Sequence, residues 1–377
     1  MEIKTNIKAE IGRIIAKGYY NFQAVRIVNM NQIRDIIRKT LEDLGFNTVE
    51  EKKEKKNYVK NYTDKQLIDK LNQALNEKKI SQEQSDFLMD CWYLVKGNNV
   101  DKTIRCKHCK KDFKIKDRLE GISYVENQYK KMMEEYIVSE PIYNEFLSKI
   151  RGIGIVLSAF AIKSFGNCEV QIYERDVANC VYGVKVNPKL IATERDFNFK
   201  EAFELYKSDP KRYFKKGYNT VSSLWKHTGN HVEDGVASKR RQGIPVNYNP
   251  KLKTFTWLIA DCLMKQNKGY YRKIYDTEKE KQLNKKYPVG YLAERYNGYD
   301  ETDVNLLLGH AHNRAKRKVG KHFLAHYWEA SRELAGLSTV KTYVEGVLEH
   351  EHIVHWKDAV NSENTLKTEV EISEIDS

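Results

Sequence analysis

The stretch Leu147–Cys168, LSKIRGIGIVLSAFAIKSFGNC, is the longest apolar run of the chain, and a Gly-Ile-Gly interrupts it near its start. Glycine has no Cβ, so Gly152 and Gly154 allow a tight turn that a side chain would obstruct. The stretch predicts two short helices joined by this turn, the second spanning about 155–165. A helix that begins directly after such a turn leaves its first N–H groups available to a phosphate.

Two interpretations of this turn remain open. In one, the glycines only allow two helices to pack closely. In the other, Arg151, with Lys149 and Lys163 nearby, helps an anion to approach the turn. The arrangement resembles the helix-hairpin-helix module, in which a Gly-x-Gly turn holds the backbone of duplex DNA without reading its sequence. That resemblance implies that Arg151, Gly152 and Gly154 bind nucleic acid.

The composition indicates a basic protein of two or three domains. Lysine and arginine number 65 against 52 acidic residues in 377, a formal net charge of +13. Such an excess favours a polyanionic partner, although lysine-rich sequences also serve solubility or thermostability. No stretch reaches the roughly 18 apolar residues of a membrane helix, and the N-terminus lacks a signal-peptide core. We therefore expect an intracellular protein, of cytoplasm or nucleoid, without a membrane partner.

Hydrophobic periodicity predicts a mainly α, multi-helix fold with a helix-hairpin-helix module and a small Cys-x-x-Cys β-hairpin. Residues 4–45 predict two helices, Ser81 and Gln84 have capping-box spacing, and Pro250 is well placed to open a helix. We expect five regions: an N-terminal helical region with a Cys-x-x-Cys knuckle (1–118), the helix-hairpin-helix module (119–168), an irregular insertion (169–218), a C-terminal helical domain (219–337), and a His-containing segment with an acidic tail (338–377).

A structural zinc ion is one expectation from the cysteines. Cys106 and Cys109 form a Cys-x-x-Cys knuckle between two short strand-like segments, which is half of a zinc ribbon. Among the remaining ligand candidates, His350 and His352 would lie on one face of an extended segment. The alternative is a reduced cysteine pair in a hairpin and a polar histidine cluster.

Two basic segments extend the case for a polyanion. Lys239, Arg240 and Arg241 follow one another in the loop GVASKRRQG, and three successive cations cannot all point inward. A predicted helix over about 303–334 carries an apolar stripe on one side and crowds cations onto the rest. Crowded like charges oppose folding, which a bound polyanion would explain. We expect Arg314, Arg317 and Lys318 to contact nucleic acid.

The order of these parts resembles the C-terminal domain of the insertion-sequence 110 transposase family. The resemblance covers 147–166 and 219–334 and rests on the glycine hairpin, Leu-Trp-x-x-x-Gly at 224–229, Ser-Lys-Arg-Arg-x-Gly at 238–243, Asn-Pro-x-Leu at 249–252 and Arg-Ala-Lys-Arg at 314–317. It implies that Ser238 matches the family's serine nucleophile. Family members also carry a RuvC-like domain with four metal-binding carboxylates, and nothing before residue 140 has the pattern of such a strand. Asn249-Pro250 replaces the family's Gly-Asn, and the spacing from Ser238 to Gly243 is shorter than the family's.

These features favour a protein of mobile-element descent that binds duplex DNA without cutting it. One alternative is an active recombinase in which Ser238 attacks a DNA phosphate. Another is an RNA-binding protein, because basic helices with many tyrosines could stack on unpaired bases. The oligomeric state stays open at this point.

Overall fold

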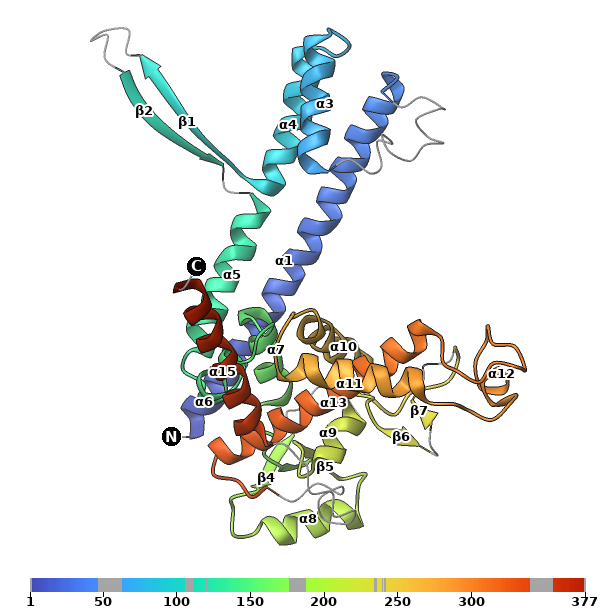
Figure 1. Ribbon diagram of the computed structural model, residues 1–377. Helices are drawn as coiled ribbons and strands as arrows, with labels where there is room; N and C mark the ends of the chain where they lie inside the picture. Colours follow the sequence, from blue (N-terminus) through green and yellow to red (C-terminus); the bar gives the residue numbers. More distant parts are fainter. Residues whose placement is uncertain are drawn as a thin grey trace. The chain divides into compact units, whose positions relative to one another are not determined.

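The computed structural model describes residues 2–46, 63–105, 112–119, 121–175, 188–233, 236–238, 240, 242–339 and 355–375. It confirms the mainly helical, multi-helix prediction and the small β-hairpin (Figure 1). The contacts divide the chain into two compact units, Met1–Glu135 and Tyr136–Ser377, which we call unit 1 and unit 2. None of the helices in the described ranges is long and apolar enough to cross a membrane.

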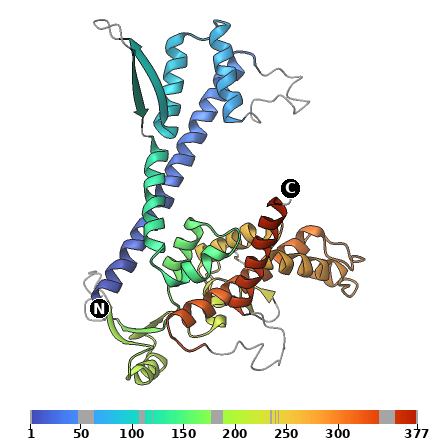
Figure 2. The same cartoon turned by 60° about the vertical axis from the view of Figure 1, so that its left-hand side comes forward.

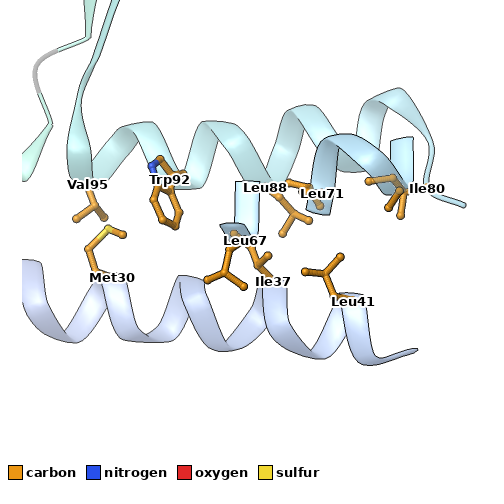
Figure 3. Close-up of a cluster of buried hydrophobic side chains, with 10 residues drawn as sticks. Met30, Ile37, Leu41, Leu67, Leu71, Ile80, Leu88, Trp92 and Val95 are labelled. Atoms are coloured by element: carbon orange, nitrogen blue, oxygen red, sulfur yellow. The ribbon is translucent and has the colours of Figure 1, made fainter. Parts of the chain in front are cut away.

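Unit 1 is built on one long helix and two shorter ones. Its elements are α1 (Glu2–Asp43), α3 (Asp64–Asn76), α4 (Gln82–Lys96), the antiparallel strands β1 (Asn98–Arg105) and β2 (Asp112–Leu119), and most of α5 (Ile122–Ile137). Met30, Ile37 and Leu41 of α1 pack against apolar side chains of α3 and α4, including Trp92 (Figure 3). Ser81 and Gln84 form the predicted capping box at the start of α4.

The prediction of two helices in 4–45 is wrong, because α1 is continuous from Glu2 to Asp43. Gly18 lies in its interior, where glycine opposes helix formation by only about 1 kcal/mol relative to alanine. A Cβ at this position would lie 2.2 Å from the ring of Tyr129 in α5. Gly18 therefore provides room for an aromatic ring within unit 1 and does not end the helix.

Unit 2 is a helical domain with a small sheet at one side (Figures 1 and 2). Its helices are α6 (Pro141–Glu145), a 3-10 turn (Leu147–Lys149), α7 (Ile155–Phe165), α8 (Phe199–Ser208), α9 (Val221–His227), α10 (Pro250–Met264), α11 (Tyr270–Asn284), α12 (Tyr291–Arg295), α13 (Leu308–Leu334) and α15 (Trp356–Ile375). Its strands are β3 (Gln171–Glu174), β4 (Lys189–Thr193) and β5 (Tyr213–Lys216), with a second pair, β6 (Val232–Glu233) and β7 (Val236–Ala237).

Helix α13 is the centre of unit 2. Its predicted apolar stripe is buried, with Val319, Phe323 and Tyr327 fully enclosed. Helices α10 and α11 lie along it, as both views show (Figures 1 and 2). The helix begins at Leu308, later than predicted. This packing fixes which faces of α10 and α13 meet and therefore which of their cations come together.

The segment 169–218 is more regular than predicted. It contains a three-stranded antiparallel sheet in the order β4-β3-β5, with α8 packed against it. Arg332 of α13 joins this sheet region to the helices, because its guanidinium is buried and bonds both carboxylate oxygens of Glu194. The strands have only four or five residues each, which is too short for a clear alternating pattern.

The predicted regions and the units of the structure have different boundaries. The predicted boundary at 118/119 lies inside unit 1, and the contacts divide at 135/136, within α5. At the C-terminal end, α15 packs on α13, and Trp356 Nε1 donates to Glu333 at 2.7 Å. Residues 356–375 are therefore part of unit 2.

Candidate nucleic-acid interface

The Gly-x-Gly turn precedes α7 as predicted, but its two glycines have different surroundings. Gly152 has a φ of +87°, and a Cβ there would lie 2.8 Å from the carbonyl oxygen of Cys262 at the end of α10. Its missing side chain therefore allows the turn to pack on α10. Gly154 is exposed, and nothing lies within 4 Å of its would-be Cβ. Only Gly154 faces space that a ligand could enter.

Arg151 is held within the protein. Its guanidinium lies 3.7 Å from the carboxylate of Glu363 in α15, which is 2% exposed. Tyr270 N–H donates to the same carboxylate at 2.8 Å. An external anion would have to compete with this buried carboxylate, so the turn is a weaker candidate than the sequence suggested.

The same substitution at the two glycines should have opposite effects on stability. Gly152→Ser forces a side chain into a positive φ and against the Cys262 backbone, so we expect a loss of about 2 kcal/mol or more in the free energy of unfolding. Gly154→Ser introduces a favoured N-cap residue at the start of α7, so we expect no loss or a small gain. Urea denaturation of both variants measures the difference. Equal destabilisation would contradict the distinct roles.

Several cations of α13 that the sequence assigned to nucleic acid have partners in the fold. Arg314 donates to Gln282 at 2.9 Å and to Tyr296 at 2.8 Å. Lys318 forms an ion pair with Glu278 at 2.7 Å. The charge of Lys318 is thus neutralised by Glu278 of α11, whereas Arg314 is held by neutral side chains. The case for a polyanion depends on the cations that remain.

We call Lys253 of α10 and Arg317 and Lys321 of α13 the cation cluster. Each is half-buried, and none forms an ion pair with a carboxylate of the described residues. Burial lowers the pKa of all three, and the charge of Arg317 lowers the pKa of both lysines further. The fold therefore holds three positive charges together where their desolvation and mutual repulsion are unfavourable.

The turn after α9 organises this cluster. Arg317 donates to the carbonyl oxygens of Asn230 at 2.9 Å and His231 at 2.7 Å. Trp225 of α9 donates from Nε1 to the Lys321 carbonyl, and the Lys321 ammonium lies 3.9 Å from the centre of the Trp225 ring. Carbonyl oxygens and an aromatic face partly compensate the cations but carry no full negative charge.

Ser238 lies beside the cluster. Its hydroxyl donates to the Gly229 carbonyl at 3.1 Å, and its own carbonyl accepts from Lys253 Nζ at 2.5 Å. Among the described residues, no carboxylate or imidazole hydrogen-bonds the Ser238 hydroxyl. The serine is therefore next to positive charge but has no partner there that could take its proton.

Of the three successive cations of the basic loop, Arg240 is described and is exposed. Lys239 and Arg241 lie outside the described residues. Lys253 and Lys321 were not among the predicted site residues. Lys321 lies four residues after Arg317 and therefore on the same helix face. That spacing could have identified it as a neighbour of Arg317 in the site. Nothing local to Lys253 indicated its position.

The predicted zinc ligands lie outside the part of the chain that the structure describes. This holds for Cys106 and Cys109, whose segment separates β1 from β2, and for His350 and His352. Within the described residues, no group of three or more His, Cys, Asp or Glu side chains could hold a metal. The zinc site therefore stays a prediction.

Elemental analysis of the purified chain measures its zinc content and so tests that prediction directly. We expect about one zinc per chain, because a structural site needs four ligands and the two cysteines and two histidines supply them. Cys106→Ser should remove the zinc and lower the melting temperature. Cys91→Ser, at a cysteine of α4 outside the knuckle, should leave the zinc content unchanged. Metal-free wild-type protein would contradict the site.

Comparison with known proteins gives no relative: no protein-family model, curated protein or solved structure matches the chain. The resemblance to the insertion-sequence 110 transposase family therefore stays a prediction from the motifs.

Proposed function

We propose that unit 2 binds the phosphate backbone of DNA at the cation cluster. The observation that carries this proposal is the absence, within the described residues, of any carboxylate paired with Lys253, Arg317 or Lys321. A phosphate would supply the missing negative charge and several acceptor oxygens. Charge-assisted hydrogen bonds would then offset the desolvation and the repulsion by Arg317 that lower the lysine pKa values.

A repeating polyanion fits this surface better than a single small anion does. The formal net charge is +13, and Arg240 adds an exposed cation two residues after Ser238. Lys226, near the end of α9, is exposed as well. Successive phosphates of one strand could contact the cluster and these flanking cations together, which gives a backbone contact that does not depend on sequence.

A second candidate function is strand transfer by Ser238, and its position beside the cluster is the observation that favours it. In that reaction the hydroxyl oxygen forms a bond to phosphorus while the bond from phosphorus to the leaving sugar oxygen breaks. The serine proton needs an acceptor, and the leaving oxygen needs a proton. The Gly229 carbonyl, which accepts the Ser238 hydrogen bond, is too weak a base for this. Binding without cleavage is therefore the function we favour.

Competition binding tests the favoured function. The full chain is titrated into a fluorescently labelled duplex, and unlabelled DNA or polyglutamate of equal charge is then added. We expect DNA to displace the label and polyglutamate to do so much more weakly, because duplex DNA carries about one negative charge per 1.7 Å of its axis and releases condensed counterions on binding. Equal displacement by polyglutamate would show general attraction of polyanions. Absence of binding at low salt would refute the proposal.

A denaturing gel distinguishes the second candidate. Strand transfer requires a covalent protein–DNA adduct that resists denaturant and that Ser238→Ala abolishes. We expect no adduct, and we expect Ser238→Ala to retain wild-type affinity within about threefold, since the loss of one neutral hydrogen bond is worth roughly 0.5–1.5 kcal/mol at most. A serine-dependent adduct would establish the recombinase instead.

A further inference from the structure

We propose that Trp257 stacks on an unpaired base of the DNA whose phosphates occupy the cation cluster, an inference that rests on the proposed function. The site would then bind a strand that has at least one base outside the double helix, next to the phosphates held by the cation cluster. The inference comes from the position, exposure and contacts of one indole ring.

Trp257 lies at the edge of the cation cluster. On α10 it follows Lys253 by four residues, so the two side chains share one face of the helix. On α13, Lys316 directly precedes Arg317, and the Lys316 ammonium lies 4.0 Å from the centre of the Trp257 ring. The ring is therefore positioned along the same α10–α13 boundary that holds Lys253 and Arg317 together.

Trp257 differs from the other tryptophans of unit 2. Trp225, Trp328 and Trp356 each donate a hydrogen bond from Nε1 to a carbonyl or carboxylate of the fold. Trp257 makes no such bond to the described residues, and it is 41% exposed. Leaving a large aromatic ring in water without a structural hydrogen bond is unfavourable for folding alone. A ligand that covers the ring would explain its position.

Lys316 fixes the orientation of this ring. The lysine is buried and forms an ion pair with Asp261, one turn after Trp257 on α10. Lys265 contacts the same carboxylate at 2.6 Å. A buried ammonium held in this way against an indole restricts the ring by a cation–π contact. A pre-oriented aromatic surface loses little freedom when a base stacks on it.

The chemistry of stacking selects the form of the DNA. Inside a duplex both faces of each base are covered by its neighbours, so an indole at the surface can stack only on a base that has left the stack. Aromatic stacking on a base is sequence-tolerant and is worth about 1–3 kcal/mol. Loss of the ring should therefore reduce affinity for unpaired DNA about 5- to 150-fold.

Two single-stranded probes of equal length test the inference, one with bases throughout and one with abasic residues at its centre. Trp257→Leu should weaken binding of the first about 5- to 150-fold and leave the second unchanged, because the abasic probe has the phosphates without the bases. Trp257→Tyr, which keeps an aromatic ring, should recover most of the affinity. Leu258→Ala, at an exposed apolar residue of the same helix, is the control and should change neither.

The outcomes separate the two proposals. If wild-type protein binds both probes equally, or if Trp257→Leu weakens both to the same extent, the stacking role is refuted while the phosphate site stands. If Trp257→Tyr behaves like Trp257→Leu with an unchanged melting temperature, the aromatic ring is not what the site uses. If wild-type protein binds no DNA, the proposed function fails and this inference fails with it.

Discussion

The double variant Lys253→Gln, Lys321→Gln should bind DNA about 100-fold more weakly than wild-type protein at low salt. A charge-assisted hydrogen bond to phosphate is worth about 1.5 kcal/mol or more, which is roughly tenfold in affinity for each lysine. The folded protein should lose little stability, because each substitution removes a half-buried charge that Arg317 repels together with its contact to the Ser238 carbonyl or the Trp225 ring. Fluorescence anisotropy and thermal melting measure the two effects.

A charge-matched control distinguishes a site from general attraction. Lys251→Gln with Lys281→Gln removes the same charge at exposed positions of α10 and α11. We expect this control to lose only a few-fold in affinity, since exposed charges act through a screened field. Equal losses in the two double variants would mean that net charge, and not the cation cluster, attracts DNA.

Arg332→Met should be the most destabilising single substitution considered for unit 2. Arg332 is 1% exposed, bonds both oxygens of Glu194, and donates from Nε to the Ser338 carbonyl. Removing one partner of a buried ion pair leaves the other charge buried without a partner, which lowers the free energy of unfolding by about 3–5 kcal/mol. Arg195→Met is the control, because Arg195 is 53% exposed in its ion pair with Glu169. Arg195→Met should lower the free energy of unfolding by less than about 1 kcal/mol.

The pH dependence of this pair has a definite sign. Burial opposes ionisation of Glu194, but the hydrogen bonds from Arg332 and from the Val170 N–H outweigh it and lower the Glu194 pKa. The pair therefore stabilises the fold above the pKa of an unfolded glutamate, about 4.3, and this stabilisation is lost as pH falls through the folded pKa. The stability difference between wild type and Arg332→Met should shrink in that acid range. A difference that is constant with pH would contradict the ion pair.

Local signals in the sequence predicted several elements correctly. Helix α7 spans 155–165 as expected, since a glycine turn and a final glycine bound its apolar run. Helix α10 begins at Pro250, with Asn249 capping its first N–H groups. These features depend on residues within one or two turns of each other, and propensity and capping act over that range.

The candidate site could be predicted only in part, because it depends on which distant residues meet. Arg314 and Lys318 looked available on α13, but their partners lie on α11 and in the segment after it, 18 to 40 residues earlier. Arg317, one residue before Lys318, has no carboxylate partner in the described ranges. Lys253 joins it only because α10 packs on α13. Periodicity shows which face of a helix is polar, but not which of its charges the fold neutralises.

The salt dependence of DNA affinity, compared between wild type and Lys253→Gln, Lys321→Gln, shows whether these two lysines contact phosphates. Each lysine that contacts a phosphate releases counterions and contributes about −0.9 to the slope of log affinity against log salt. We predict that the wild-type slope is steeper than that of the double variant by about 2. Identical slopes, with both proteins folded, would show that these lysines contact no phosphate and would contradict the cation cluster as the DNA-binding site.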